Sequence, residues 1–149
     1  MRIKILAVAF WGVFLSAAIA GSSKPGFVLR FYLQSTTQTG SNWTLVEVPD
    51  PPQTIAIEKY GFLSEKYIDK ATLLPDGTTL IQFDSIGVNV LNTTTSANIG
   101  KIMVVVCNNR VIYAPVIDQP LTQGRIMLPG IQPEELKQLR EYIEKHKKG

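Results

Sequence analysis

Few side chains in this sequence have the types and spacings that support catalysis. The 149-residue chain contains one histidine, His146, and one cysteine, Cys107, so no intramolecular disulfide can form. His146 lies in a lysine-rich C-terminal segment, where a general base would be poorly fixed. Cys107 has only Arg110 as a basic neighbour in the sequence, and we expect an inert, packed thiol.

The carboxylates are dispersed along the chain. A carboxylate-based hydrolase, the weakest of our hypotheses, would have to draw on Glu58, Asp69, Asp84 and Asp118. Glu134 and Glu135 are adjacent, and their expected role is to face the positive end of a helix dipole. The sequence has neither a cluster of metal ligands nor a phosphate-binding glycine pattern. We therefore predict a non-enzymatic protein with no catalytic residues, no metal and no cofactor.

The first twenty residues have the pattern of an export signal. Arg2 and Lys4 precede an uncharged apolar run at 5–20, which ends in a small-x-small motif before Gly21. The run is shorter than the roughly 20 residues that a membrane-spanning helix needs. We predict a signal peptide at 1–20 and one domain at 21–149, periplasmic or secreted, with no transmembrane segment in the mature chain. An uncleaved membrane anchor is the alternative.

The charge of the sequence argues against a nucleic acid partner. The formal net charge of +3 falls to about +1 without Arg2 and Lys4, and a lysine-rich tail at 145–148 supplies much of the remaining positive charge. The mature length suits one domain with a modest core.

Alternating apolar residues predict several strands. The segments are 27–34, 44–48, 54–58, 78–83, 102–106, 111–117 and 123–128. Residues 102–106 are continuously apolar, which indicates a central strand covered on both faces. Asn108 and Asn109 suit a two-residue type I′ turn, because asparagine tolerates positive φ.

Three segments are candidate helices. Ser64 could cap a short helix that carries Tyr67, Ile68 and Ala71 on one side. Residues 85–99 have poor helix propensity but repeat apolar residues at helical spacing, and we predict a helix that ends at Gly100. A C-terminal helix at about 133–147 begins with Pro133, and Gln132 is its expected N-cap. Its predicted buried stripe is Leu136, Leu139, Tyr142 and Ile143.

A longer pattern extends over most of the mature chain. Its parts are Phe83, Leu91, Thr95, Asn98-Ile-Gly-Lys101, the apolar strand at 102–106, Val111-Ile-Tyr-Ala-Pro115, Pro120-Leu-Thr-Gln-Gly124, Gly130 and Pro133-Glu-Glu135. This order resembles the head of the first periplasmic domain of SecD, a membrane component of the bacterial protein-export machinery. Residues 57–59 and 63–71 are similar to the strand and short helix that open that head. The hairpin tip departs from the pattern, since the family usually has Asp-Gly where Asn108-Asn109 stands.

The resemblance implies an α+β, ferredoxin-like domain with a mixed or antiparallel sheet and two to three helices packed mainly on one face. It also implies a binding or accessory domain that contacts exported or unfolded polypeptides, or a component of the translocon or envelope, and that is membrane-proximal at most. The residues of the family motif, which include a possible binding edge, are Asn98, Gly100, Tyr113, Ala114, Pro115, Gly124 and Gly130.

Two interpretations of that edge remain open. Ala114-Pro115 and Gly124 are typical of a strand exit and a bulge, or of an edge to which an extended peptide adds as a strand. An envelope protein that self-associates through a sheet edge is the alternative function.

Overall fold

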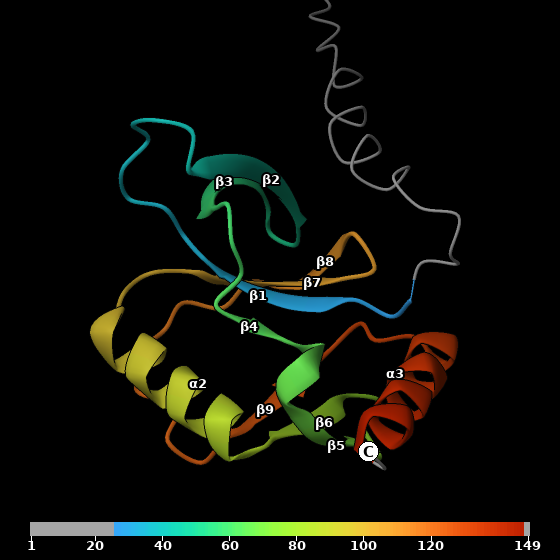
Figure 1. Cartoon of the computed structure of the whole chain (residues 1–149). Coiled ribbons are helices and arrows are strands. Elements are labelled where there is room, and N and C mark those ends of the chain that lie inside the picture. The colour runs from blue at the N-terminus through green and yellow to red at the C-terminus, as the bar shows by residue number, and fades with distance from the viewer. Residues whose placement is uncertain (1–25, 148–149) are drawn as a thin grey trace, which may run out of the picture.

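The computed structural model describes residues 26–147 (Figure 1). The predicted signal peptide at 1–20 lies outside these residues. In chain order the elements are β1 (Leu29–Leu33), β2 (Trp43–Pro49), β3 (Pro52–Glu58), β4 (Leu63–Ser64), a 3-10 helix (Glu65–Tyr67), β5 (Ile68–Leu73), β6 (Thr79–Phe83), α2 (Ser85–Ala97), β7 (Met103–Cys107), β8 (Arg110–Tyr113), β9 (Arg125–Leu128) and α3 (Pro133–Lys147). Within 26–147, no helix has the length and hydrophobicity needed to cross a membrane.

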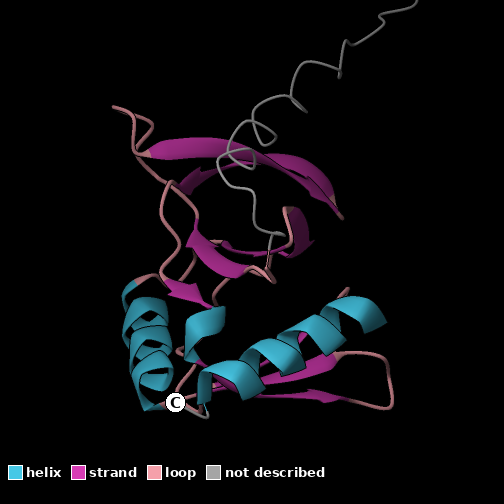
Figure 2. Cartoon of the chain, turned by 45° about the vertical axis from the view of Figure 1, so that its right-hand side comes forward, coloured by secondary structure: helices cyan, strands magenta, loops and turns pink. Residues whose placement is uncertain are grey.

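The strands of residues 26–147 form three sheets in which every pairing is antiparallel. A four-stranded sheet has the order β4-β1-β7-β8, a three-stranded sheet has the order β5-β6-β9, and β2 and β3 form a separate hairpin. This arrangement confirms the predicted α+β class. Figure 2 shows both helices on one side of the four-stranded sheet and the β2–β3 hairpin on the other.

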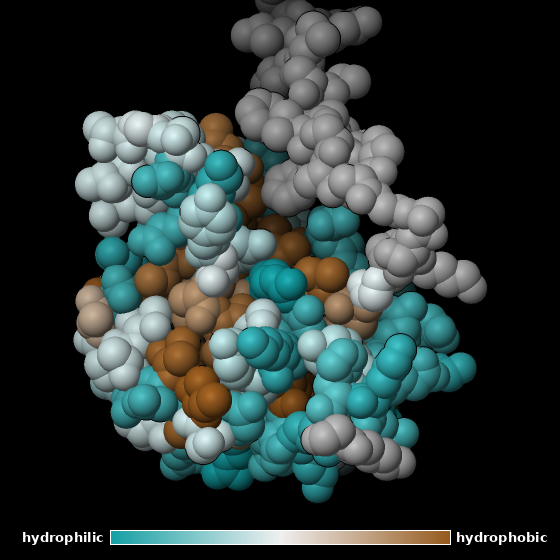
Figure 3. Space-filling view, viewed as in Figure 1, coloured by the Kyte–Doolittle hydropathy of each residue, from teal (hydrophilic) through white to brown (hydrophobic). Residues whose placement is uncertain are grey.

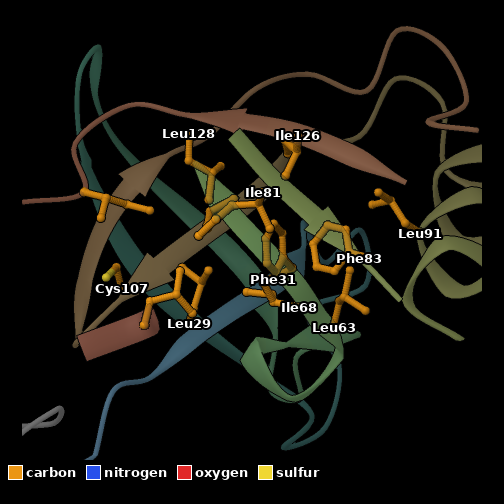
Figure 4. Close-up of a cluster of buried hydrophobic side chains, with 14 of the residues drawn as sticks. Leu29, Phe31, Leu63, Ile68, Ile81, Phe83, Leu91, Cys107, Ile126 and Leu128 are labelled. Atoms are coloured by element: carbon orange, nitrogen blue, oxygen red, sulfur yellow. The ribbon is translucent and has the colours of Figure 1, made fainter. Parts of the chain in front are cut away.

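Two hydrophobic clusters cover the two faces of the four-stranded sheet. The larger cluster joins its lower face to the three-stranded sheet and to both helices. In Figure 4, Phe31 of β1 lies against Phe83 of β6, with ring centroids 5.6 Å apart. The smaller cluster packs the β2–β3 hairpin onto the upper face. All five residues of β7 are buried, which confirms the central strand that the apolar run predicted.

The ends of α2 and α3 are closed by local hydrogen bonds. Asp84 caps α2, because its side chain accepts a 2.8 Å bond from the Gly87 N–H, and Gly100 follows the helix with φ of 90°. Gln132 precedes α3, and its N–H donates to Glu135 at 3.0 Å in a capping-box arrangement. Both helices thus form where the sequence predicted them.

The short helix predicted after Ser64 is wrong beyond its first turn. Only Glu65–Tyr67 is helical, as a 3-10 turn, and Ser64 makes no side-chain capping bond. Ile68 and Ala71 belong instead to β5, which pairs with β6 across the Pro75-Asp76-Gly77 turn. Pairing with the next strand of this hairpin satisfies the backbone groups that a weak local helix would have used.

The hairpin between β7 and β8 confirms the predicted turn. Asn108 and Asn109 both have positive φ, 48° and 66°, as a type I′ turn requires. Farther along, Val106 pairs with Val111 and Val105 with Tyr113, so Ile112 is an extra residue on β8. This bulge lies just before the predicted strand exit at Ala114 and Pro115.

Candidate functional site

A groove of about 460 Å³ lies between β9 and the segment that follows β8. Tyr113, Pro115 and Val116 line one side of the groove, and Arg125, Ile126 and Met127 of β9 line the other. Val116 is 58% exposed and Met127 is 57% exposed, so two exposed apolar side chains line one groove. The groove is therefore the place where the predicted edge residues Tyr113 and Pro115 meet an accessible apolar surface.

The remaining motif residues hold the walls of this groove in place. The Gly100 N–H donates to the Ile117 carbonyl at 2.7 Å, and the Asn98 side chain donates to the Thr94 carbonyl at 2.7 Å to close α2. Thr95, fully buried in α2, accepts a 2.9 Å bond from the N–H of Leu121, which lines the groove. These contacts tie the wall that follows β8 to the C-terminal half of α2.

Gly124 determines the position of the opposite wall of the groove, which is β9. It precedes β9 with φ of 64°, and a Cβ atom there would lie only 2.1 Å from Val88 Cγ2 of α2. Its carbonyl accepts a 2.9 Å bond from the Phe83 N–H, which starts the β6–β9 ladder. Only glycine permits this close approach of β9 to the helix. Ala114, by contrast, is half-buried and packs on the smaller cluster.

The outer edge of β9 has free backbone groups. The Phe83 N–H donates to the Gly124 carbonyl, so Phe83 and Gly124 are a hydrogen-bonded pair. The next hydrogen-bonded pairs of the ladder, two residues apart on each strand, are Ile81 with Ile126 and Thr79 with Leu128. Alternate residues of an antiparallel strand direct their N–H and C=O groups to opposite sides, so those of Arg125 and Met127 point away from β6. Within residues 26–147, no strand pairs with that side of β9.

The other edge of the same sheet is covered by α3 at Asp69 and Ala71, whereas the last residue of β5, Leu73, is 56% exposed and lines a separate groove beside α3. Arg140 Nε donates to the carbonyl of Ala71 in β5 at 3.3 Å, and Lys147 forms an ion pair with Asp69. These contacts occupy polar groups of β5 that would otherwise face an incoming strand.

A buried carboxylate closes the outer edge of β1. The two-residue strand β4 pairs with Arg30 and Phe31 only. Beyond it, Glu65 accepts a 3.1 Å bond from the Leu29 N–H and forms an ion pair with Arg30. Glu65 is buried, and a buried carboxylate needs partners in place of water. The Leu29 N–H and the Arg30 guanidinium are those partners. No local pattern in the sequence indicates this role for Glu65.

The outer edge of β8 is interrupted at the bulge. Gly130 lies against Ile112, since a Cβ atom built on Gly130 would be 3.4 Å from Ile112 Cβ. Arg110 at the start of β8 donates to the Gly130 carbonyl at 3.2 Å. Gly130 therefore covers part of the outer edge of β8 and lies outside the groove.

Glu135 at the start of α3 binds the tip of the β7–β8 hairpin. It accepts bonds from Cys107 Sγ at 3.3 Å and Asn108 Nδ2 at 3.2 Å, and it forms an ion pair with Arg110. Burial alone would raise the pKa of Glu135, but the bonds from the Gln132 N–H, Arg110 and Cys107 outweigh it and lower the pKa.

Cys107 is not arranged as a nucleophile. Its side chain is fully buried at the end of β7. Burial, and then the hydrogen bond to Glu135, raise the pKa of the thiol to about 12. The thiolate is therefore suppressed at neutral pH, as the sequence analysis expected of a packed thiol.

The dispersed carboxylates stay on separate elements. Asp84 caps α2, Asp69 pairs with Lys147, Asp118 lines the groove, and Glu58 ends β3 on the opposite side of the four-stranded sheet. His146 stacks on Tyr142 near the end of α3. Between residues 26 and 147, no three acidic, histidine or cysteine side chains are grouped to hold a metal ion.

Two other surfaces fit a partner less well. A groove beside α3, of about 620 Å³, is bordered by four charged side chains of that helix, Lys137, Arg140, Glu141 and Glu144. Hydrophobic atoms also gather over α2 in Figure 3, where Ile86 is 59% exposed. Ile86 lines neither groove.

The predicted edge residues include Tyr113 and Pro115 on one wall of the groove and Gly124 at the start of the other, but not the β9 residues that line it. Arg125, Ile126 and Met127 were predicted as a strand, but nothing in their alternation identifies an edge. The signal that was present is Met127, a large apolar residue on the polar side of an alternating strand.

Comparisons with known proteins agree with this fold. The family model for the SecDF P1 head subdomain matches residues 42–144. A 48-residue stretch is 42% identical to the protein translocase subunit SecD of Acetobacter pasteurianus. That stretch is 32% of this chain and 9% of the relative, so the match spans a small part of the relative's length.

Two solved structures share the fold at low sequence identity. One, from work on SecDF as a membrane component that enhances protein export, has a TM-score of 0.53 at 22% identity and covers 75% of this chain and 59% of that chain. The other, SecDF in a super-membrane-facing form, has a TM-score of 0.54 at 21% identity and covers 75% of this chain and 18% of that chain.

Proposed function

This chain belongs to the SecDF P1 head subdomain family, and from that premise we propose that it is a non-enzymatic accessory domain of protein export that binds a polypeptide partner. SecDF is described as enhancing protein export, and the curated relative is a protein translocase subunit. This chain matches 9% of that relative, so a role in export is part of the proposal. The partner is an exported polypeptide or a component of the translocon or envelope.

One observation carries the binding part of the proposal, the groove between β9 and residues 115–121. It lies within the family match, it exposes Val116 and Met127, and the motif residues Gly100 and Gly124 position its walls. Apolar clefts with a few polar groups are the usual form of a binding site. The scattered roles of the carboxylates and the suppressed Cys107 thiol support binding over catalysis.

The proposed location is outside the cytoplasm. The apolar run at 5–20 and the small residues before Gly21 support export and cleavage, which leave the domain at 21–149 periplasmic or secreted.

Site-specific photo-crosslinking in the native cell envelope tests this proposal. A photoreactive residue is placed at Val116 or Met127 in the groove, and a matched control is placed at Tyr60, which is 73% exposed on the segment between β3 and β4. We expect crosslinks to translocon subunits or exported precursors from the groove positions and few from Tyr60. Equal capture at all three positions, or none in the groove, contradicts the proposal.

Self-association is the second candidate function, and the free edge of β9 favours it. Sheet edges that are left unpaired also pair between copies of a protein. Such an envelope protein would form oligomers whose mass rises with protein concentration and which dissociate when the β9 edge is blocked. Sedimentation of the exported, purified chain at several concentrations separates the two candidates.

A further inference from the structure

We propose that the polypeptide partner adds to the outer edge of β9 as a fourth strand of the three-stranded sheet, and that its bound segment is apolar and without net charge. This inference rests on the proposed function above and names how the same groove recognises its ligand.

The backbone of β9 supplies the hydrogen-bonding complement. The N–H and C=O groups of Arg125 and Met127 point away from β6, and both residues line the groove. An extended segment in the groove would satisfy these groups in a ladder that does not depend on ligand sequence.

The other edges of the three- and four-stranded sheets are less suited to strand addition. Arg140 and α3 occupy the edge of β5, Glu65 closes β1 beyond β4, and the bulge at Ile112 interrupts β8. β9 has no proline and no bulge between Arg125 and Leu128. Among the edges of the three- and four-stranded sheets within 26–147, it is the one that directs the backbone groups of two alternate residues, Arg125 and Met127, into a groove.

The charge and shape of the groove select the occupant. Its charged lining residues are Asp118 and Arg125, which have opposite signs, so a segment without net charge fits best. Val116 and Met127 present apolar surface from both walls. Because residues 115–121 form a wall opposite β9, the space suits one extended chain better than a second folded copy.

Fluorescence anisotropy with a synthetic peptide tests the ladder. The probe is a labelled ten-residue peptide of alternating valine and threonine with acetyl and amide ends, and the protein is the chain purified after export. N-methylation of all valines is compared with N-methylation of all threonines. One of the two should weaken binding at least tenfold and the other less than threefold, because alternate peptide N–H groups face β9.

Two substitutions at one position separate backbone from side chain. Met127→Pro removes an edge-facing N–H without removing a ladder bond to β6, and should weaken binding at least tenfold. Met127→Thr keeps that N–H and should weaken binding less than threefold. Thermal unfolding of both variants checks that they fold, and slowed amide exchange at Met127 in the wild-type complex reports the new bond without any substitution.

The outcomes distinguish this inference from the proposed function. No binding of the unmodified peptide by the wild-type chain overturns both. Binding that tolerates both N-methylation patterns and Met127→Pro overturns strand addition and leaves the proposed function standing. Peptide-free dimers that Met127→Pro dissociates assign the β9 edge to a second copy, and overturn the inference.

Discussion

β5 and β9 are the two edges of one sheet, and they differ in what lies beside them. β5 is covered by α3, with Arg140 bonded to Ala71 and Lys147 paired with Asp69. β9 borders a groove and directs the backbone groups of two residues into it. The difference shows that coverage is specific to each edge, because polar side chains such as Glu65 and Arg140 close the edges of β1 and β5. We expect changes that remove such covers or the close contact at the start of β9 to cost stability, and a change at the exposed Met127 to cost little.

The largest effect is expected from removing the apolar anchor of α3. Leu139 is fully buried in the larger cluster, and Leu139→Ala should lower the free energy of unfolding by about 3 kcal/mol, since a cavity replaces the side chain. Urea unfolding gives the value, with Lys137→Ala on the exposed side of α3 as the control. A loss under about 1 kcal/mol would show that α3 is not a tight cover of β5.

Gly124→Ala, at the start of β9, is expected to lower the free energy of unfolding almost as much. The new Cβ would collide with Val88 and the residue would keep a positive φ, which together cost about 3 kcal/mol. Gly77→Ala is the matched control, because Gly77 also has positive φ but an added Cβ there meets nothing within 4 Å. Its expected cost is about 1 kcal/mol. Equal losses in thermal unfolding would mean that contact with Val88 is unimportant.

Glu65→Leu opens the edge of β1. The Leu29 N–H loses its acceptor and Arg30 loses its ion-pair partner, so we expect a loss of about 2 kcal/mol in urea unfolding. Glu65→Gln keeps an acceptor for Leu29 and should lose less than half as much. If the two variants are equally stable, the carboxylate is not what closes this edge.

Glu135→Gln weakens the contact between α3 and the β7–β8 hairpin in a pH-dependent way. The pKa of Glu135 is lowered in the folded state, so its charge stabilises the fold above the ordinary pKa of about 4.5, and that contribution is lost as pH falls through the folded value. We expect the variant to be about 1 kcal/mol less stable at pH 7. The gap should close in acid, and a gap that is constant with pH would contradict this account.

Met127→Lys tests the open edge with the smallest change in stability. Met127 is exposed, so unfolding should shift by no more than about 0.5 kcal/mol. A lysine on an edge strand discourages strand pairing, so binding of a neutral extended peptide should weaken severalfold. Unchanged binding in a fluorescence titration would place the ligand elsewhere.

Local patterns in the sequence predicted much of the fold. Asn108 and Asn109 determine their turn through φ, and Pro133 and Glu135 act within one turn of α3, so neighbouring residues were sufficient. The stretch after Ser64 failed because β5 is stabilised by a strand that begins at Thr79. Local spacing cannot report that pairing.

The candidate site was less predictable because its parts are far apart in the chain. The contact of Glu65 with Leu29 joins residues 36 positions apart, and that of Arg140 with Ala71 joins residues 69 positions apart. Tyr113, Pro115 and Gly124 were predicted as edge residues, but Arg125, Ile126 and Met127 were predicted only as part of a strand. A strand is an edge strand when no other strand pairs with one of its sides, and only the complete strand order shows this for β9.

The bonds of Glu135 also bear on how the domain opens. One carboxylate joins the start of α3, the end of β7 and the turn at Asn108, whose backbone N–H donates to the Val28 carbonyl beside β1. If α3 detaches, Cys107, Asn108 and Arg110 lose the same acceptor at once. We therefore expect the first strand, the central hairpin and the last helix to open as one cooperative unit in hydrogen exchange, although β1 and α3 lie near opposite ends of the described residues.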